Sequence, residues 1–156
     1  MTGGWPRYWS ASVVRRRHAW HIEGMDWDLT DFFPSLTAPS FRKAFAQLQA
    51  DATALLEEMQ AWAALSPDEP SLWADGLNRY ESLSAQRSHI GSFISCHRAA
   101  DGTNSDARRA GADLAKIGAT FSKLRTELVR GIGRAEPVAR EALLKVEGMG
   151  ELGYRI

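Results

Sequence analysis

Hydrophobic residues recur every three or four positions along most of the chain after residue 40. The first such stripe covers six helical turns and consists of Phe41, Phe45, Leu48, Ala52, Leu55, Met59 and Trp62. This spacing places the stripe on one face of an α-helix, because 3.6 residues make one turn. The pattern therefore predicts an amphipathic helix near residues 40–65.

A second helix is predicted over residues 67–100. The segment Ser66–Glu69 has the residue types of a helix start, with Ser66 as the N-cap, Pro67 at the first helical position and Glu69 completing a capping box. The apolar positions that follow are Leu72, Trp73, Leu77, Tyr80, Leu83, Ile90, Phe93 and Ile94. The middle of this helix, residues 84–89, is polar.

A third helix is predicted over residues 104–131, and a short fourth helix over residues 136–147. The segment Thr103–Asp106 is interpreted as another capping box, and Gly131-Ile132-Gly133 as a glycine stop. The third stripe consists of Ala107, Ala110, Leu114, Ile117, Phe121, Leu124 and Leu128. Alternating β-branched runs typical of strands are not found after residue 25. We therefore expect an all-α fold, an antiparallel bundle of three long helices plus the short fourth helix.

Residues 1–24 differ from the rest of the chain. They contain Trp5, Trp9 and Trp20 and have four arginines against one acid, so their net charge is +3. Their apolar residues follow neither a helical nor a strand period. One interpretation is a basic arm, centred on Arg15–Arg17, for nucleic acid or a membrane surface. An unstructured leader or upstream extension is favoured, which leaves residues 25–156 as the helical region.

Composition narrows the class of protein. The whole chain has 19 Lys plus Arg and 19 Asp plus Glu, and this zero net charge argues against a dedicated nucleic-acid binder. A single cysteine cannot form an internal disulfide, which fits a reducing compartment and predicts a cytoplasmic location. No apolar run approaches the roughly 18 residues that span a membrane. We therefore expect neither nucleic-acid nor membrane partners.

The histidines do not form a recognisable metal motif. A common zinc peptidase carries H-E-x-x-H, and none of His18, His21, His89 and His97 is followed by Glu. His18 and His21 have helical spacing, but there is no Cys nearby and Glu23 is the only nearby carboxylate, so a chance pairing is favoured. His89 and Cys96 are about 10 Å apart along a helix axis, too far for one ion. Cys96 is interpreted as a small core residue, and no role is predicted for His97. We therefore predict no catalytic, cofactor-binding or metal-binding residues in this chain.

Three further polar groups have ordinary structural explanations. Asp101 opens a segment with Gly at its second position rather than the sixth, so a turn is favoured over a calcium loop. The adjacent Glu57 and Glu58 are expected to face solvent. Arg87 falls on the face that continues from the apolar stripe. It is expected either to be buried beside a carboxylate, or to face a cavity for a ligand, and the first is favoured. The carboxylates proposed for it are those of Asp113 and Glu127.

The order of elements resembles that of a known family. The opening Trp27–Ser35, with the sequence WDLTDFFPS, is similar to the start of the oligoendopeptidase F family, zinc metallopeptidases of the thimet oligopeptidase group. Further matches are Leu77, Tyr80, Glu81 and Leu83 in the second helix. The last match is Glu141–Leu144, with Tyr154 a short distance beyond. The resemblance covers residues 26–156.

The resemblance implies the helical N-terminal region of a peptidase, which sits over the channel leading to the zinc site. The zinc ligands of the family lie in a much larger C-terminal part that this chain lacks. We therefore expect a fragment that is inactive alone and binds no cofactor of its own. Its expected partners are peptides, the catalytic part, or a second copy held through the fourth helix and the second helix around Arg87 and His89. The alternative is a stand-alone helical module that binds peptides or a partner protein.

Overall fold

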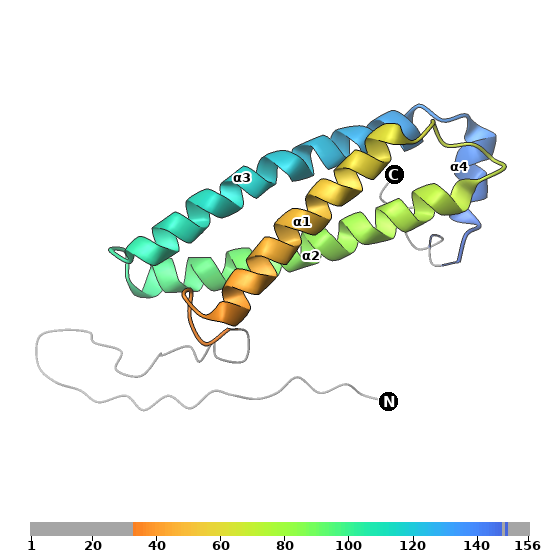
Figure 1. The fold of residues 1–156 in the computed structure, drawn as a ribbon. Coiled ribbons are helices and arrows are strands. Elements are labelled where there is room, and N and C mark those ends of the chain that lie inside the picture. The colour runs from red at the N-terminus through yellow and green to blue at the C-terminus, as the bar shows by residue number, and fades with distance from the viewer. Residues whose placement is uncertain (1–32, 148, 150–156) are drawn as a thin grey trace, which may run out of the picture.

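The computed structural model describes residues 33–147 and residue 149, and all regular structure within these residues is helical. The helices are α1 (Pro39–Ala61), α2 (Pro70–Ala100), α3 (Ser105–Leu128) and α4 (Pro137–Leu144), with a short π-helix, η1 (Val129–Gly133), directly after α3 (Figure 1). The all-α class and the short fourth helix are thus confirmed for this part of the chain. The predicted leader, residues 1–24, and the segment from Trp27 to Phe32 lie outside the described residues.

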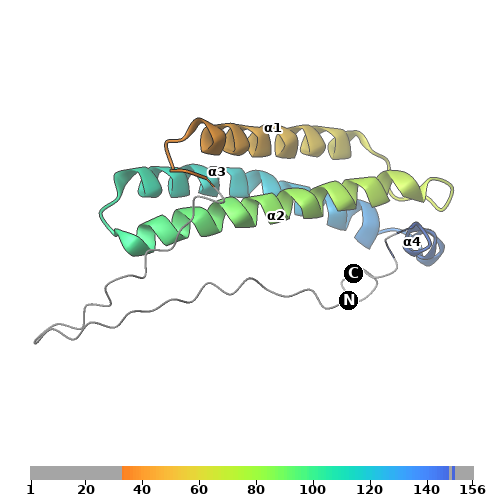
Figure 2. The ribbon, with the colours of Figure 1, turned by 90° about the horizontal axis from the view of Figure 1, so that it is seen from below.

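The three long helices contact one another pairwise, and α4 packs against α2. Figure 2 shows α1 lying on one side of the pair formed by α2 and α3. The predicted stripes of the three long helices are buried or half-buried except for Leu72, which is exposed, and their most deeply buried members include Leu48, Leu55, Trp73 and Leu124. Burial of such side chains, at about 25 cal/mol per Å² of apolar surface, is the main term that holds the helices together.

Helix α2 begins three residues later than the sequence pattern predicts. Its first residue is Pro70, and its N-cap is Glu69, whose φ of −138° and ψ of 59° are not helical. A proline disfavours the α conformation in the residue before it, so a helix that started at Pro67 could not continue through Glu69. The Ser66 hydroxyl accepts a hydrogen bond from the Asp68 amide in a turn instead of capping the helix. The predicted capping box at Ser66 is therefore wrong.

The boundaries of α3 also differ from the prediction. The N-cap is Asn104, whose side chain accepts a hydrogen bond of 2.9 Å from the Ala107 amide, so the predicted capping box at Thr103 is wrong. Thr103 instead donates from its amide and its hydroxyl to Asp101 Oδ1, at 2.8 and 2.6 Å. These bonds lower the pKa of the Asp101 carboxyl below its ordinary value. The group is an Asx-type turn that joins α2 to α3.

The remaining helix boundaries also differ from the predicted ones, because the helices are shorter or end in a different type of turn. Helix α1 ends at Ala61 rather than near residue 65, and Trp62 is its extended C-cap. The α-helical part of α3 ends at Leu128, and the predicted glycine stop is a π turn that includes Gly131. Helix α4 covers residues 137–144 rather than 136–147. The residues between α1 and α2 therefore form a linker that is not helical.

Candidate functional site

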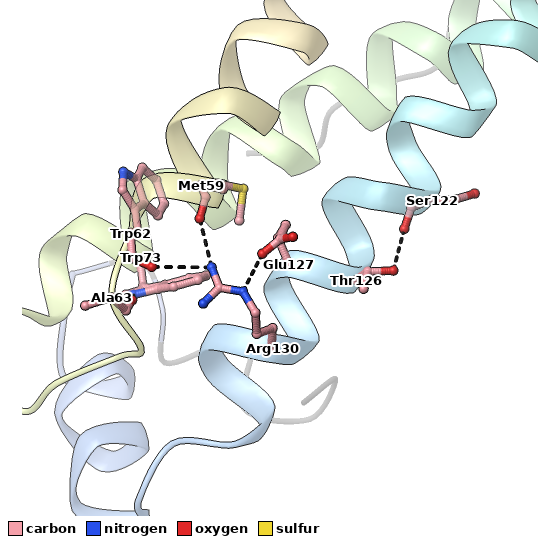
Figure 3. A network of polar contacts seen from close by, with 8 residues as sticks. All are labelled: Met59, Trp62, Ala63, Trp73, Ser122, Thr126, Glu127 and Arg130. Carbon is pink, nitrogen blue, oxygen red and sulfur yellow. Dashed lines mark hydrogen bonds and ion pairs between the residues drawn. The ribbon is translucent and has the colours of Figure 1, made fainter.

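Arg130 holds the C-terminal end of α1. From η1, its Nη2 donates to the carbonyl oxygens of Met59 and Trp62, at 3.0 and 3.3 Å, and its Nε donates to Glu127 (Figure 3). The last carbonyls of a helix have no partner within the helix and carry partial negative charge. The guanidinium therefore caps α1 by donating to the Met59 carbonyl, which also accepts a hydrogen bond of 3.3 Å from the Trp62 amide, and to the carbonyl of Trp62, the C-cap just beyond the helix. The half-buried Glu127 orients it.

Trp73 packs into the same region from α2. Its indole Nε1 donates to the Ala63 carbonyl at 3.2 Å, and its ring meets that of Trp62 edge to face, with centroids 5.3 Å apart. The backbone amide of Leu65 donates to the Gly131 carbonyl at 3.2 Å. The linker between α1 and α2 is thus fixed to η1 and to the start of α2. All these groups are satisfied, so the cluster is structural and offers no reactive group.

A groove of about 790 Å³ runs between α1 and α3. Apolar residues at its base include Phe41, Phe45 and Ile117, of which Phe45 is half-buried. Its rims are polar, and the charged lining residues are Arg42, Asp106, Arg109, Asp113 and Lys116. We call this feature the α1–α3 groove. It has the character of a binding surface, because an apolar base supplies affinity and charged rims supply orientation.

The predicted site residues on α2 are not brought together into a metal site. His89 is exposed, whereas Cys96 is half-buried and lies outside the buried core in which the sequence analysis placed it. The ring of His97 packs edge to face on Phe93, with centroids 4.7 Å apart. Among residues 33–147 and 149, no three His, Cys, Asp or Glu side chains are placed to hold a metal ion. The described residues therefore do not fit the zinc of the family that the sequence resembles, and His18 and His21 lie outside them.

Arg87 has a different partner from the two that the sequence suggested. Its side chain is exposed, and its guanidinium carbon lies 5.3 Å from the centre of the Phe121 ring. The expected carboxylates are engaged elsewhere, with Asp113 paired to Lys116 at 2.7 Å and Glu127 to Arg130. The prediction of a buried Arg87 ion pair is therefore wrong. A cation–π contact with the ring takes its place.

Glu58 forms an ion pair that sequence reasoning missed. Both of its oxygens accept hydrogen bonds from Arg79 on α2, at 2.6 and 3.0 Å. These bonds hold the pKa of the Glu58 carboxyl below its ordinary value and raise the pKa of Arg79. Glu57 remains exposed, as expected for a solvent-facing residue. The two residues of the pair are 21 positions apart, and no local pattern links them.

Large exposed hydrophobic side chains are concentrated at one end of the described part of the chain. They are Leu72, Val129, Val138 and Leu144, of which Val129 and Val138 are 59% and 60% exposed. They belong to the start of α2, to η1 and to α4, which lie together at the end shown on the right in Figure 1. We call this set the apolar end. The opposite end, where α2 turns into α3, has no such side chain among the described residues.

Searches for related proteins add no relative. Comparison of the chain with family models, with curated proteins and with solved structures gave no match. Within the described residues, no helix is both long enough and apolar enough to cross a membrane.

Proposed function

We propose that the chain is the helical, non-catalytic N-terminal region of an oligoendopeptidase F-like zinc metallopeptidase. In this proposal it docks onto the catalytic part of such an enzyme through the apolar end. Support comes from the family-like segments of the sequence. Of these, Tyr80 packs on Phe121 with centroids 6.1 Å apart, and Leu83 is buried. Both residues are therefore part of the helical scaffold rather than of a reactive site.

The observation that carries the proposal is the one-sided distribution of exposed apolar side chains. Single exposed hydrophobics are common on protein surfaces, but a group confined to one end is typical of an interaction site. Leu72, Val129, Val138 and Leu144 come from three segments that meet at that end. An apolar surface of the catalytic part would cover them.

In this proposal the chain has a structural role and supplies no catalytic residue. The three long helices would act as a rigid antiparallel bundle that forms one wall of a peptide channel in the cytoplasm. Zinc and the groups that activate water would come from the catalytic part. The chain alone would hydrolyse no peptide.

The proposal is tested by titrating the chain with the separately produced catalytic part of an oligoendopeptidase F-like enzyme. Calorimetry is expected to show saturable one-to-one binding. Val129→Asp combined with Val138→Asp is expected to weaken it at least tenfold, since two charges would be desolvated in the interface. Ala119→Asp, on an exposed position of α3 away from the apolar end, is the matched control and should bind like the original chain. Equal binding by all three proteins, or none, would contradict docking through this end.

A second candidate function is a stand-alone module that binds peptides or a partner protein, and the α1–α3 groove favours it. The groove has an apolar base around Phe45 and charged rims that could orient an extended or helical segment. A labelled peptide library distinguishes the two candidates. Peptides that bind the chain without the catalytic part, and that are lost on Phe45→Ser, would favour the stand-alone module.

A further inference from the structure

The charged residues of α3 that line the α1–α3 groove alternate in sign. In chain order they are Asp106, Arg109, Asp113 and Lys116, at spacings of three, four and three. Residues at these spacings follow one another along a single face of a helix. The α3 rim of the groove therefore carries negative and positive charges in alternation, one per helical turn.

A rim of this kind is complementary to itself when two copies lie antiparallel. With the copies centred on residue 111, Asp106 faces Lys116 of the second copy, and Arg109 faces Asp113 of the second copy. Each contact occurs twice, as a twofold interface requires. A parallel arrangement in register would instead place like charges side by side. The pattern thus selects both the partner and its direction.

We propose that the α1–α3 groove is the contact surface of a symmetric homodimer, in which α3 of each copy lies antiparallel in the groove of the other. The apolar base would then be covered by the second copy, with Phe45 and Ala110, both half-buried in the single chain, losing their remaining contact with water. Arg42 and Gln49 on the α1 rim would flank the helix of the second copy.

The ion pair within the rim does not prevent these contacts. Lys116 is 78% exposed and Asp113 is 44% exposed, although they pair within one chain at 2.7 Å. Such an exposed pair contributes only about 0–1 kcal/mol, so exchanging it for a contact with the second copy costs little. The groove is separate from the apolar end, so the dimer does not depend on the docking onto a catalytic part proposed above.

The dimer should be weak and sensitive to salt. Four ion pairs between exposed groups and a short apolar base correspond to a small interface, and we expect a dissociation constant on the order of 10–100 µM in low salt. At about 1 M salt the Debye length falls to about 3 Å, which screens the pairs and shifts the chain toward monomer.

Charge reversal gives a test with an internal rescue. Sedimentation equilibrium of Arg109→Asp alone, or of Asp113→Arg alone, is expected to show monomer, because two like-charge contacts arise at the centre of the interface. The double variant Arg109→Asp/Asp113→Arg restores both contacts and should dimerise again. An equal mixture of the two single variants should form heterodimers. Lys123→Asp, an exposed charge reversal on α3 outside the groove, is the control and should dimerise normally.

Several outcomes would overturn the proposal. A chain that stays monomeric up to about 1 mM in low salt has no such interface. If the single variants dimerise like the original chain, the contact lies elsewhere on the surface. If Val138→Asp then abolishes dimerisation, the contact involves α4. A double variant that stays monomeric while its circular dichroism and melting match the original chain would show that the pairing of opposite charges is not what joins the copies.

Discussion

The Trp73 ring occupies the space in which a side chain on residue 131 would lie. A Cβ placed on Gly131 would be 1.8 Å from Trp73 Cη2 and 2.1 Å from Cζ2, far inside van der Waals contact. Trp73 is 1% exposed and is held by its hydrogen bond to Ala63, so it has no free direction in which to move. The absence of a side chain at residue 131 is thus a condition for the packing of α2 against η1.

Gly131→Ala is therefore expected to lower the free energy of unfolding by at least about 2 kcal/mol, since overpacking of a filled core typically costs 1–3 kcal/mol. Gly133→Ala, in the same π turn, is the matched control. A Cβ there would meet its nearest atom, Val129 Cγ1, at an ordinary 3.6 Å, so little change is expected. Urea unfolding followed by circular dichroism measures both. Equal stability of the two variants would show that Trp73 does not fill this space in solution.

Arg130→Met should lower the free energy of unfolding by about 2 kcal/mol. The variant keeps much of the apolar stem but removes the charged donor to the carbonyls of Met59 and Trp62, of which Met59 keeps its 3.3 Å hydrogen bond from the Trp62 amide. Hydrogen bonds to charged groups contribute about 1.5–3 kcal/mol. Arg125→Met, on the exposed face of α3, is the control and should change stability by no more than about 0.5 kcal/mol. If the two variants have the same melting curve, Arg130 does not stabilise the fold by capping α1.

Arg87→Met is expected to cost no more than about 1 kcal/mol, which is the usual size of an exposed cation–π contact. Chemical denaturation of the variant gives this value directly. A loss well above 2 kcal/mol would instead indicate the buried carboxylate partner that the sequence suggested, because breaking a buried ion pair costs about 3–5 kcal/mol.

The ion pair between Glu58 and Arg79 should make stability depend on pH in the acid range. The pKa of Glu58 is lower in the folded chain than its ordinary value of 4.5, because Arg79 donates hydrogen bonds to its carboxylate. The pair therefore stabilises the fold above about pH 4.5, and this contribution is lost as the pH falls through the lowered pKa. Its size is at most about 1 kcal/mol, since the two side chains are 47% and 38% exposed.

Unfolding of Glu58→Gln at several pH values measures this contribution. Its deficit relative to the original chain should be present at pH 7 and shrink as the pH falls below 4.5 through the lowered pKa of Glu58. Glu57→Gln, at the neighbouring exposed position, should show no deficit at either pH. A deficit of Glu58→Gln that persists unchanged at pH 3 would mean that the charge of Glu58 is not its source.

The sequence predicts the helices well but their ends poorly. The stripe from Phe41 to Met59 is a local pattern, so it survives any tertiary arrangement that buries one face. Helix ends depend on competition between neighbouring signals. Ser66 and Thr103 both look like N-caps, yet Pro70 and Asn104 determine where α2 and α3 begin.

The contacts of the candidate sites could not be predicted from the sequence, for a different reason. Arg130 and Met59 are 71 positions apart, and only the folded chain brings them together. The same holds for the α1–α3 groove, whose two walls come from separate helices. The alternating charges of its α3 rim were readable in the sequence. Their meaning depends on knowing that they share a groove with Phe45.

The proposed function makes this chain the N-terminal region of an oligoendopeptidase F-like peptidase. The most direct test is a chimera in which residues 26–156 replace the corresponding region of an active member of that family. We expect the chimera to bind zinc and cleave a peptide substrate, and Val129→Asp with Val138→Asp to reduce cleavage strongly. A chimera that folds and binds zinc but cleaves no peptide would contradict it.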